Sequence, residues 1–75
     1  MAKTRRHFAV CVRNEGYEVS LELRKIYEVL PDQVAGRHRQ IRVIDESGED
    51  YLFPASWFAA LELPTPTKRA VLAAV

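Results

Sequence analysis

The stretch from Asp45 to Phe58 constrains the fold more than any other part of the chain. Ser47-Gly48 stands between two apolar runs, and glycine accepts the positive φ that tight hairpin turns require. Pro54 has no backbone N–H, so we expect it to end a strand over Tyr51–Phe53 rather than continue it. The stretch therefore predicts an acidic turn, a short strand, a proline-started bend and a further apolar strand.

Similar short apolar runs recur along the chain, separated by turn residues. In one of them Ile41 and Val43 alternate with Arg42, which places the two aliphatic side chains on one face of a strand. Five short strands at this spacing, with no long helix among them, predict an all-β fold, namely a small barrel closed on itself. The predicted strands are Phe8–Val12, Ile26–Leu30, Gln40–Asp45, Tyr51–Phe53 and Phe58–Leu61.

The segment Tyr17–Lys25 lies between the first two predicted strands and alternates between apolar and polar residues. Strict period-two alternation over this length favours an extended chain whose buried face is formed by Tyr17, Val19, Leu21 and Leu23. A helix is the alternative, because Glu18, Glu22 and Lys25 would then share one side of it. The alternation fits the extended chain better.

Two helical segments are expected outside the strands. The polar connector Gln33–Arg39 can hold one helical turn capped at Gly36. Near the C-terminus, good helix formers over Thr67–Val75 follow Thr65 and Pro66, which suit the N-cap and the first helical position. The predicted C-terminal helix is marginal alone in water, so its apolar face must dock. That face consists of Val71, Leu72 and Val75, and it can pack on the barrel of its own chain or on a second copy in a weak homodimer.

The length of 75 residues predicts a single domain. Residues 1–7 are expected to form a flexible basic N-terminus, residues 8–62 the barrel, and residues 63–75 a proline-led linker with the short helix. The net charge of +1 gives no argument for a polyanionic partner. The lone Cys11 favours a reducing compartment, and no stretch approaches the roughly 20 apolar residues that span a membrane. We therefore expect a complete soluble cytoplasmic protein without membrane contact.

Two segments resemble parts of an SH3 domain. Leu52–Leu61 looks like its last part, where a Leu/Phe-Pro pair leads through small residues into an aromatic residue and a final strand. Val19–Leu30 resembles the segment that closes the long first loop of that fold. The two matches lie in the right order and cover roughly residues 8–62. The chain is similar overall to the short SH3-like proteins found as stand-alone bacterial chains.

The chain also departs from the SH3 domains that bind proline-rich peptides. Its first strand, Phe8–Arg13, lacks their tyrosine motif, and no tryptophan pair follows Leu30. Of the peptide-binding residues, the resemblance carries over Pro54 and Trp57, with Tyr17 as an extra candidate in the long loop. The resemblance therefore supports the fold more than it supports this activity.

The leading functional prediction is a non-catalytic protein-interaction module. Aromatic side chains are common interface anchors, so the candidate binding groove consists of Tyr17, Tyr51, Pro54 and Trp57. The alternative is that Trp57 closes the barrel end and Tyr51 fills the edge of the core. Another function class is nucleic-acid binding, in which a basic face of Arg37, Arg39 and Arg42, with the basic N-terminus, would contact phosphates.

Catalysis is not expected. Cys11 lies within an apolar strand, where cysteine usually behaves as a small buried hydrophobe, and His7 and His38 share no element. The chain has no glycine-rich phosphate loop and no His/Cys metal cluster. The acidic turn also lacks the ligand spacing of a calcium loop. We therefore expect no catalytic residues, no metal and no cofactor.

Overall fold

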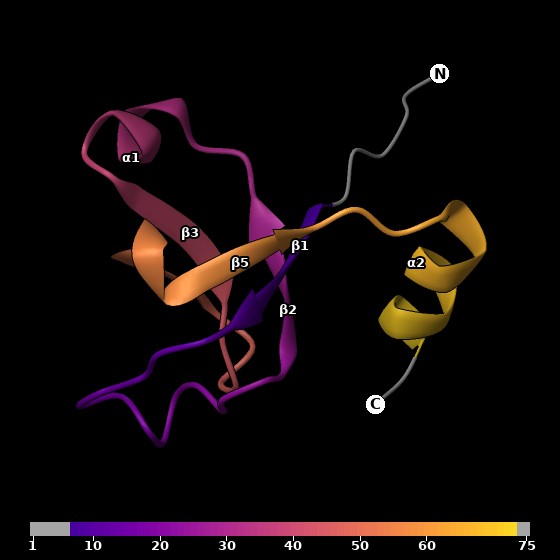
Figure 1. The fold of residues 1–75 in the computed structure, drawn as a ribbon, viewed down its shortest axis with the longest axis horizontal. Coiled ribbons are helices and arrows are strands. Elements are labelled where there is room, and N and C mark those ends of the chain that lie inside the picture. Colours follow the sequence, from indigo (N-terminus) through magenta and orange to yellow (C-terminus); the bar gives the residue numbers. More distant parts are fainter. Residues whose placement is uncertain (1–6, 74–75) are drawn as a thin grey trace.

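The computed structural model describes residues 7–73, which form one antiparallel sheet and short helical segments (Figure 1). The strands are β1 (His7–Cys11), β2 (Ile26–Leu30), β3 (Gln40–Ile44), β4 (Asp50–Pro54) and β5 (Phe58–Leu61). The helical segments are α1 (Gln33–Arg37), the 3₁₀ turn η1 (Ala55–Trp57) and α2 (Thr65–Ala73). Within residues 7–73, neither α-helix has the length and apolar character needed to cross a bilayer. The strand-rich fold follows the sequence prediction, with strand bounds that agree to within one residue.

The strands are arranged in the order β4-β3-β2-β1-β5. Each pair is antiparallel, and β1 lies between β2 and β5, with Cys11 opposite Phe58. The β3–β4 hairpin sets Val43 opposite Tyr51 and Ile41 opposite Phe53. No strand pairing in the described range joins β4 to β5, so the sheet is open between them. The predicted closure of the barrel by backbone pairing is therefore not confirmed.

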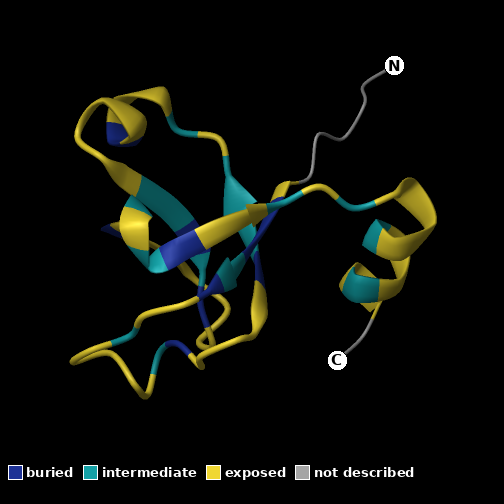
Figure 2. Ribbon diagram, viewed as in Figure 1, coloured by how far each residue is buried: buried dark blue, intermediate teal, exposed yellow. Residues whose placement is uncertain are grey.

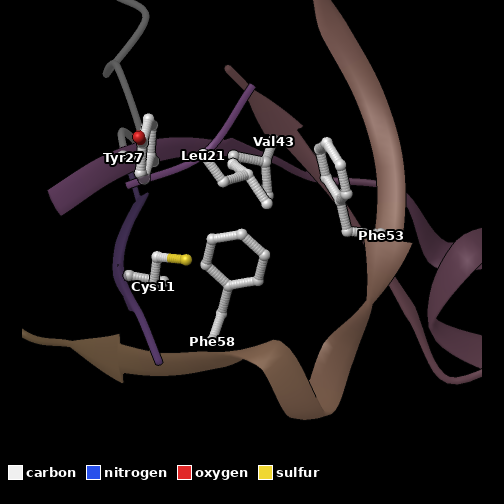
Figure 3. Packing of buried hydrophobic residues seen from close by; sticks show 7 residues of the cluster. Cys11, Leu21, Tyr27, Val43, Phe53 and Phe58 are labelled. Atoms are coloured by element: carbon white, nitrogen blue, oxygen red, sulfur yellow. The ribbon is translucent and has the colours of Figure 1, made fainter. Parts of the chain in front are cut away.

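The core is formed by one inward face of every strand. Figure 3 shows these side chains meeting in one interior, with the Cys11 sulfur directed at the ring of Phe58. As predicted, Val43 is buried and Ile41 packs against the core. Arg42 points to the other face, where it forms ion pairs. The buried cluster is Ala9, Cys11, Leu21, Tyr27, Val43, Phe53 and Phe58.

The segment between β1 and β2 departs from the prediction. It is a series of turns rather than an extended chain, because the backbone N–H groups of Ser20 and Leu21 both donate to the carbonyl of Tyr17. Leu21 is fully buried, whereas Val19, two residues away, is 93% exposed. The predicted alternation of buried and exposed residues is therefore wrong. The N–H groups of Ser20 and Leu21 bond within the turn, and that of Glu22 bonds to the Tyr27 hydroxyl, so no neighbouring strand imposes period two on these side chains.

The two predicted helices exist, but their capping residues differ from those predicted. Asp32 caps α1 by accepting the N–H of Ala35 on its carboxylate, while Gly36 lies inside the helix instead of capping it. The left-handed residue after α1 is Arg39, at φ 59°. In α2 the first helical hydrogen bond runs from Lys68 N–H to the carbonyl of Pro64, so the N-cap is Pro64 rather than Thr65.

Helix α2 stands apart from the strands at the end of an extended linker (Figure 1). Figure 2 shows buried positions along the strands and none on α2. Val71 and Leu72 line a hollow of about 260 Å³ together with Phe8 of β1 and Ile26 of β2, so the helix has apolar residues of the sheet opposite it. The remaining member of the predicted docking face, Val75, lies outside the described residues.

Leu21→Ala and Val19→Ala distinguish the turn from an extended strand. We expect Leu21→Ala to lower the free energy of unfolding by about 2–5 kcal/mol, because it leaves a cavity in the core. Val19→Ala should change it by less than about 0.5 kcal/mol, because Val19 is exposed. Urea unfolding of both variants measures this. Equal losses would show that both side chains are buried and would contradict the turn.

Candidate functional site

Three aromatic rings from separate parts of the chain meet beside the core. Tyr17 comes from the loop between β1 and β2, Phe53 from β4 and Trp57 from η1. The Tyr17 ring lies 5.6 Å from Phe53 and 5.6 Å from Trp57, edge-on to both. Phe53 and Trp57 are stacked, with ring centroids 6.4 Å apart. Because Tyr17 is half exposed, the cluster presents aromatic surface to solvent.

The backbone around η1 fixes the position of Trp57. Pro54 ends β4 with its ring-constrained φ at −59° and starts the 3₁₀ turn. The N–H of Ala55 donates to the carbonyl of Arg39, and the carbonyl of Trp57 accepts the N–H of Val12. The indole packs against the core but is not fully buried. Trp57 therefore combines core packing with partial exposure, so the two alternatives posed by the sequence are not exclusive.

A hollow of about 330 Å³ lies between the turn at Tyr17 and the β3–β4 hairpin. Tyr51 is 48% exposed at the edge of the sheet and borders the hollow together with Tyr17. The complete lining is Tyr17, Ser20, Asp45, Ser47, Tyr51, Leu52 and Phe53. Of the four predicted groove residues, the structure thus brings Tyr17 into contact with Trp57 and into one hollow with Tyr51. Pro54 is exposed at the end of β4 and outside this lining.

The hairpin side of the hollow is acidic. Asp45 is only 7% exposed, and its Oδ1 accepts hydrogen bonds from the N–H and the hydroxyl of Ser47 at 2.9 and 2.6 Å. The Tyr51 hydroxyl donates to Glu49 at 3.1 Å. This hydrogen bond and the negative charge of Glu49 raise the pKa of Tyr51, with smaller contributions from Asp45 and Asp50. The hollow therefore has the carboxylate of Asp45 in its lining and that of Glu49 bonded to Tyr51.

A polar clamp, formed by Lys25, Tyr27 and Glu46, holds the turn against the hairpin. The Glu46 carboxylate accepts hydrogen bonds from Lys25 Nζ and from the Tyr27 hydroxyl. The Tyr27 oxygen in turn accepts the N–H of Glu22 at 2.8 Å. Glu46 also donates its backbone N–H to the carbonyl of Ser20 at 3.0 Å. Burial, followed by the bond to Glu46, raises the pKa of Tyr27, so its hydroxyl stays protonated.

The three residues of this clamp are not among the predicted site residues. One signal was available, since a tyrosine at an inward strand position needs a partner for its hydroxyl. The sequence does not show which residue provides that partner, because Glu46 is distant along the chain from Tyr27.

The predicted basic face is not assembled as a set of free cations. Arg42 lies between two carboxylates, with Nε 2.8 Å from Asp32 and Nη1 2.9 Å from Asp50. Arg37, the last residue of α1, and Arg39, which follows the helix, are both exposed. Residues 1–6, which include most of the basic N-terminus, lie outside the described range. The charge of Arg42 is therefore largely neutralised within the fold.

Cys11 is the remaining residue with nucleophilic chemistry that the sequence pointed out. Its side chain is fully buried, and burial raises the pKa of its thiol. A neutral buried thiol is a poor nucleophile.

No protein-family model, curated protein or solved structure matches the chain. Function is therefore inferred from the geometry of the aromatic cluster and its hollow.

The clamp predicts how stability depends on pH. Its bonds to Lys25, and then to Tyr27, lower the pKa of Glu46 below the ordinary value of 4.5. Ionised Glu46 therefore contributes stability at pH values above 4.5, and this contribution is lost as the pH falls through the lowered pKa. We expect Glu46→Gln to be less stable than the wild type near neutrality and to lose less stability on acidification.

Urea midpoints measured from about pH 7 down to about pH 2 test this expectation. Glu62→Gln, which removes the same charge from an exposed position after β5, serves as the control. Parallel pH profiles for the wild type and Glu46→Gln would rule out the clamp as a source of acid sensitivity.

Proposed function

We propose that this chain is a non-catalytic protein-interaction module built on an SH3-like arrangement of strands. The observation that carries the proposal is the contact of Tyr17 with Trp57, which joins a half-exposed ring in the long loop to the indole of η1. Pro54 and Tyr51 flank this pair along β4. Together these four residues form the proposed binding surface.

The order of elements supports the SH3-like arrangement. A long loop separates β1 from β2, a short hairpin joins β3 to β4, and a 3₁₀ turn stands between β4 and β5. The last of these falls on Pro54–Trp57, within the segment that resembles the end of an SH3 domain. The open sheet is compatible with this arrangement, since β4 and β5 are its two edge strands.

The chemistry of the surface favours a peptide partner. Tyrosine and tryptophan side chains bury a large area at small entropic cost and keep a polar tip, which makes them frequent hot spots. Their positions here are fixed before binding, because Trp57 is held by the bonds around η1 and Tyr17 by the turn that ends at Leu21. Such preorganisation reduces the entropic cost of association.

Nucleic-acid binding is the competing proposal, and the ion pairs of Arg42 weigh against it. A phosphate at this position would have to displace Asp32 or Asp50, and the hairpin adds further negative charge nearby. Arg37 and Arg39 remain as exposed cations. Two exposed arginines give a small phosphate-binding surface compared with the multiple contacts of typical nucleic-acid modules.

An NMR titration of the isotope-labelled protein with a pool of proline-rich peptides tests the proposal. We expect the indole N–H signal of Trp57 and the amide signal of Tyr17 to move. For a responding peptide, Tyr17→Leu should weaken binding at least about tenfold, because it removes an anchor ring. Val19→Ala is the matched control, since it changes an exposed side chain in the same turn.

A parallel titration uses single-stranded and duplex oligonucleotides. Shifts confined to Arg37, Arg39 and their neighbours, and abolished by added salt, would favour the nucleic-acid proposal instead. An unmoved Trp57 indole across the whole peptide pool would contradict the aromatic surface as a peptide-binding site.

A further inference from the structure

The hollow beside the aromatic cluster has its own chemistry. Its walls combine the rings of Tyr17 and Tyr51 with the carboxylate of Asp45 and the hydroxyl side chains of Ser20 and Ser47. No lysine or arginine contributes to its lining. Aromatic faces carry negative charge density, so rings and a carboxylate around one hollow attract a cation.

Asp45 provides an acceptor that the fold does not use. Asp45 is only 7% exposed, yet both hydrogen bonds to its carboxylate come from Ser47 and end on Oδ1. Within residues 7–73, no hydrogen bond ends on Oδ2. Every fully buried side-chain oxygen of these residues has a hydrogen-bond partner, so Oδ2 must be accessible to solvent. A largely buried carboxylate is stabilised by charged hydrogen-bond donors. A cationic donor from a bound partner would satisfy the second oxygen of Asp45.

Two cations that bond to residues of the β3–β4 hairpin are already paired. Lys25 binds Glu46 at 2.5 Å, and Arg42 binds Asp50 and Asp32. Asp45 lines the hollow, and the carboxylate of Glu49 accepts the hydroxyl of the lining residue Tyr51 at 3.1 Å, which places two negative charges at the hollow. Within residues 7–73, no lysine or arginine in the lining of the hollow neutralises the carboxylate of Asp45.

We propose that this hollow binds the guanidinium group of an arginine side chain on a partner protein or peptide. The planar guanidinium stacks on the tyrosine rings and donates to Asp45 Oδ2, while its remaining donors meet the serine hydroxyls. Lysine fits less well, because its compact ammonium group is strongly hydrated and does not stack. The volume of about 330 Å³ accommodates one such side chain. This inference rests on the proposed interaction function and adds the chemistry of the partner.

N-acetylarginine amide, its citrulline analogue and its lysine analogue are the probes. Citrulline has nearly the shape of arginine without its charge. We expect arginine to shift the amide signals of Ser47 and Tyr51 and to bind at least about tenfold more tightly than citrulline, a difference of about 1.4 kcal/mol. Lysine should bind more weakly than arginine. Equal binding of arginine and citrulline, or of arginine and lysine, would overturn the proposal.

Variants test the residues of the hollow. Asp45→Asn keeps an Oδ1 acceptor for Ser47 but removes the charge, and it should reduce arginine affinity at least about tenfold. Tyr51→Leu, which leaves the acidic turn intact, should also weaken binding and gives a second test if Asp45→Asn fails to fold. Glu62→Gln is the control, because it removes the same charge from a residue that does not line the hollow. This variant should bind arginine as the wild type does.

The experiment separates this proposal from the general one. If proline-rich peptides shift the Trp57 indole signal while arginine shifts neither Ser47 nor Tyr51, the arginine site would be overturned. The proposed interaction module would still be supported. Arginine-specific shifts at Ser47 and Tyr51 without any peptide response at Trp57 would support the arginine site and contradict the aromatic surface as a peptide-binding site.

Discussion

The hydroxyl of Tyr27 lies where three parts of the chain meet, and the site depends on the bonds that converge there. The ring of Tyr27 belongs to the core. Its hydroxyl oxygen accepts the N–H of Glu22 from the long loop, and the hydroxyl donates a hydrogen bond to Glu46 on the hairpin. Neither the loop nor the hairpin pairs with the other as a strand. Their relative position is therefore set by side-chain bonds and by the one backbone bond from Glu46 to Ser20.

The open side of the sheet explains where the aromatic residues gather. Because β4 and β5 do not exchange backbone hydrogen bonds, η1 and the turn at Tyr17 cover the core at this end with side chains instead. Aromatic rings suit this position, since they exclude water from the core on one side and remain accessible on the other. A structural requirement and a candidate binding surface thus coincide in Trp57 and Tyr17.

The strands could be predicted from the sequence because each carries its own signal. Phe58–Leu61 is a short apolar run after a proline-led bend, and Ser47-Gly48 marks the hairpin by turn chemistry, with Gly48 at φ 88°. The turns at Tyr17–Leu21 could not be predicted in this way. Their alternation imitates a strand, and only the tertiary position of Leu21 decides which side chain is buried.

The candidate site was predictable in its residue types but not in its arrangement. Tyr17, Tyr51 and Trp57 stand out as aromatic residues in a small chain, and two of them do touch. The clamp and the open oxygen of Asp45 depend on contacts between distant segments, which composition and spacing do not encode. Arg42 shows the same limit, because its two carboxylate partners become visible only when β3 and β4 are paired.

Helix α2 has a lower local stability than the sheet. Its backbone bonds are internal, no described residue of it is buried, and a helix of nine residues has little stability of its own. The strands share one core, so their amides open only with the sheet. Amide hydrogens of α2 should consequently exchange through local fraying, at rates that do not follow the global unfolding of the sheet. Cooperative folding among the described residues therefore belongs to the sheet, and α2 adds a helix of low local stability beside it.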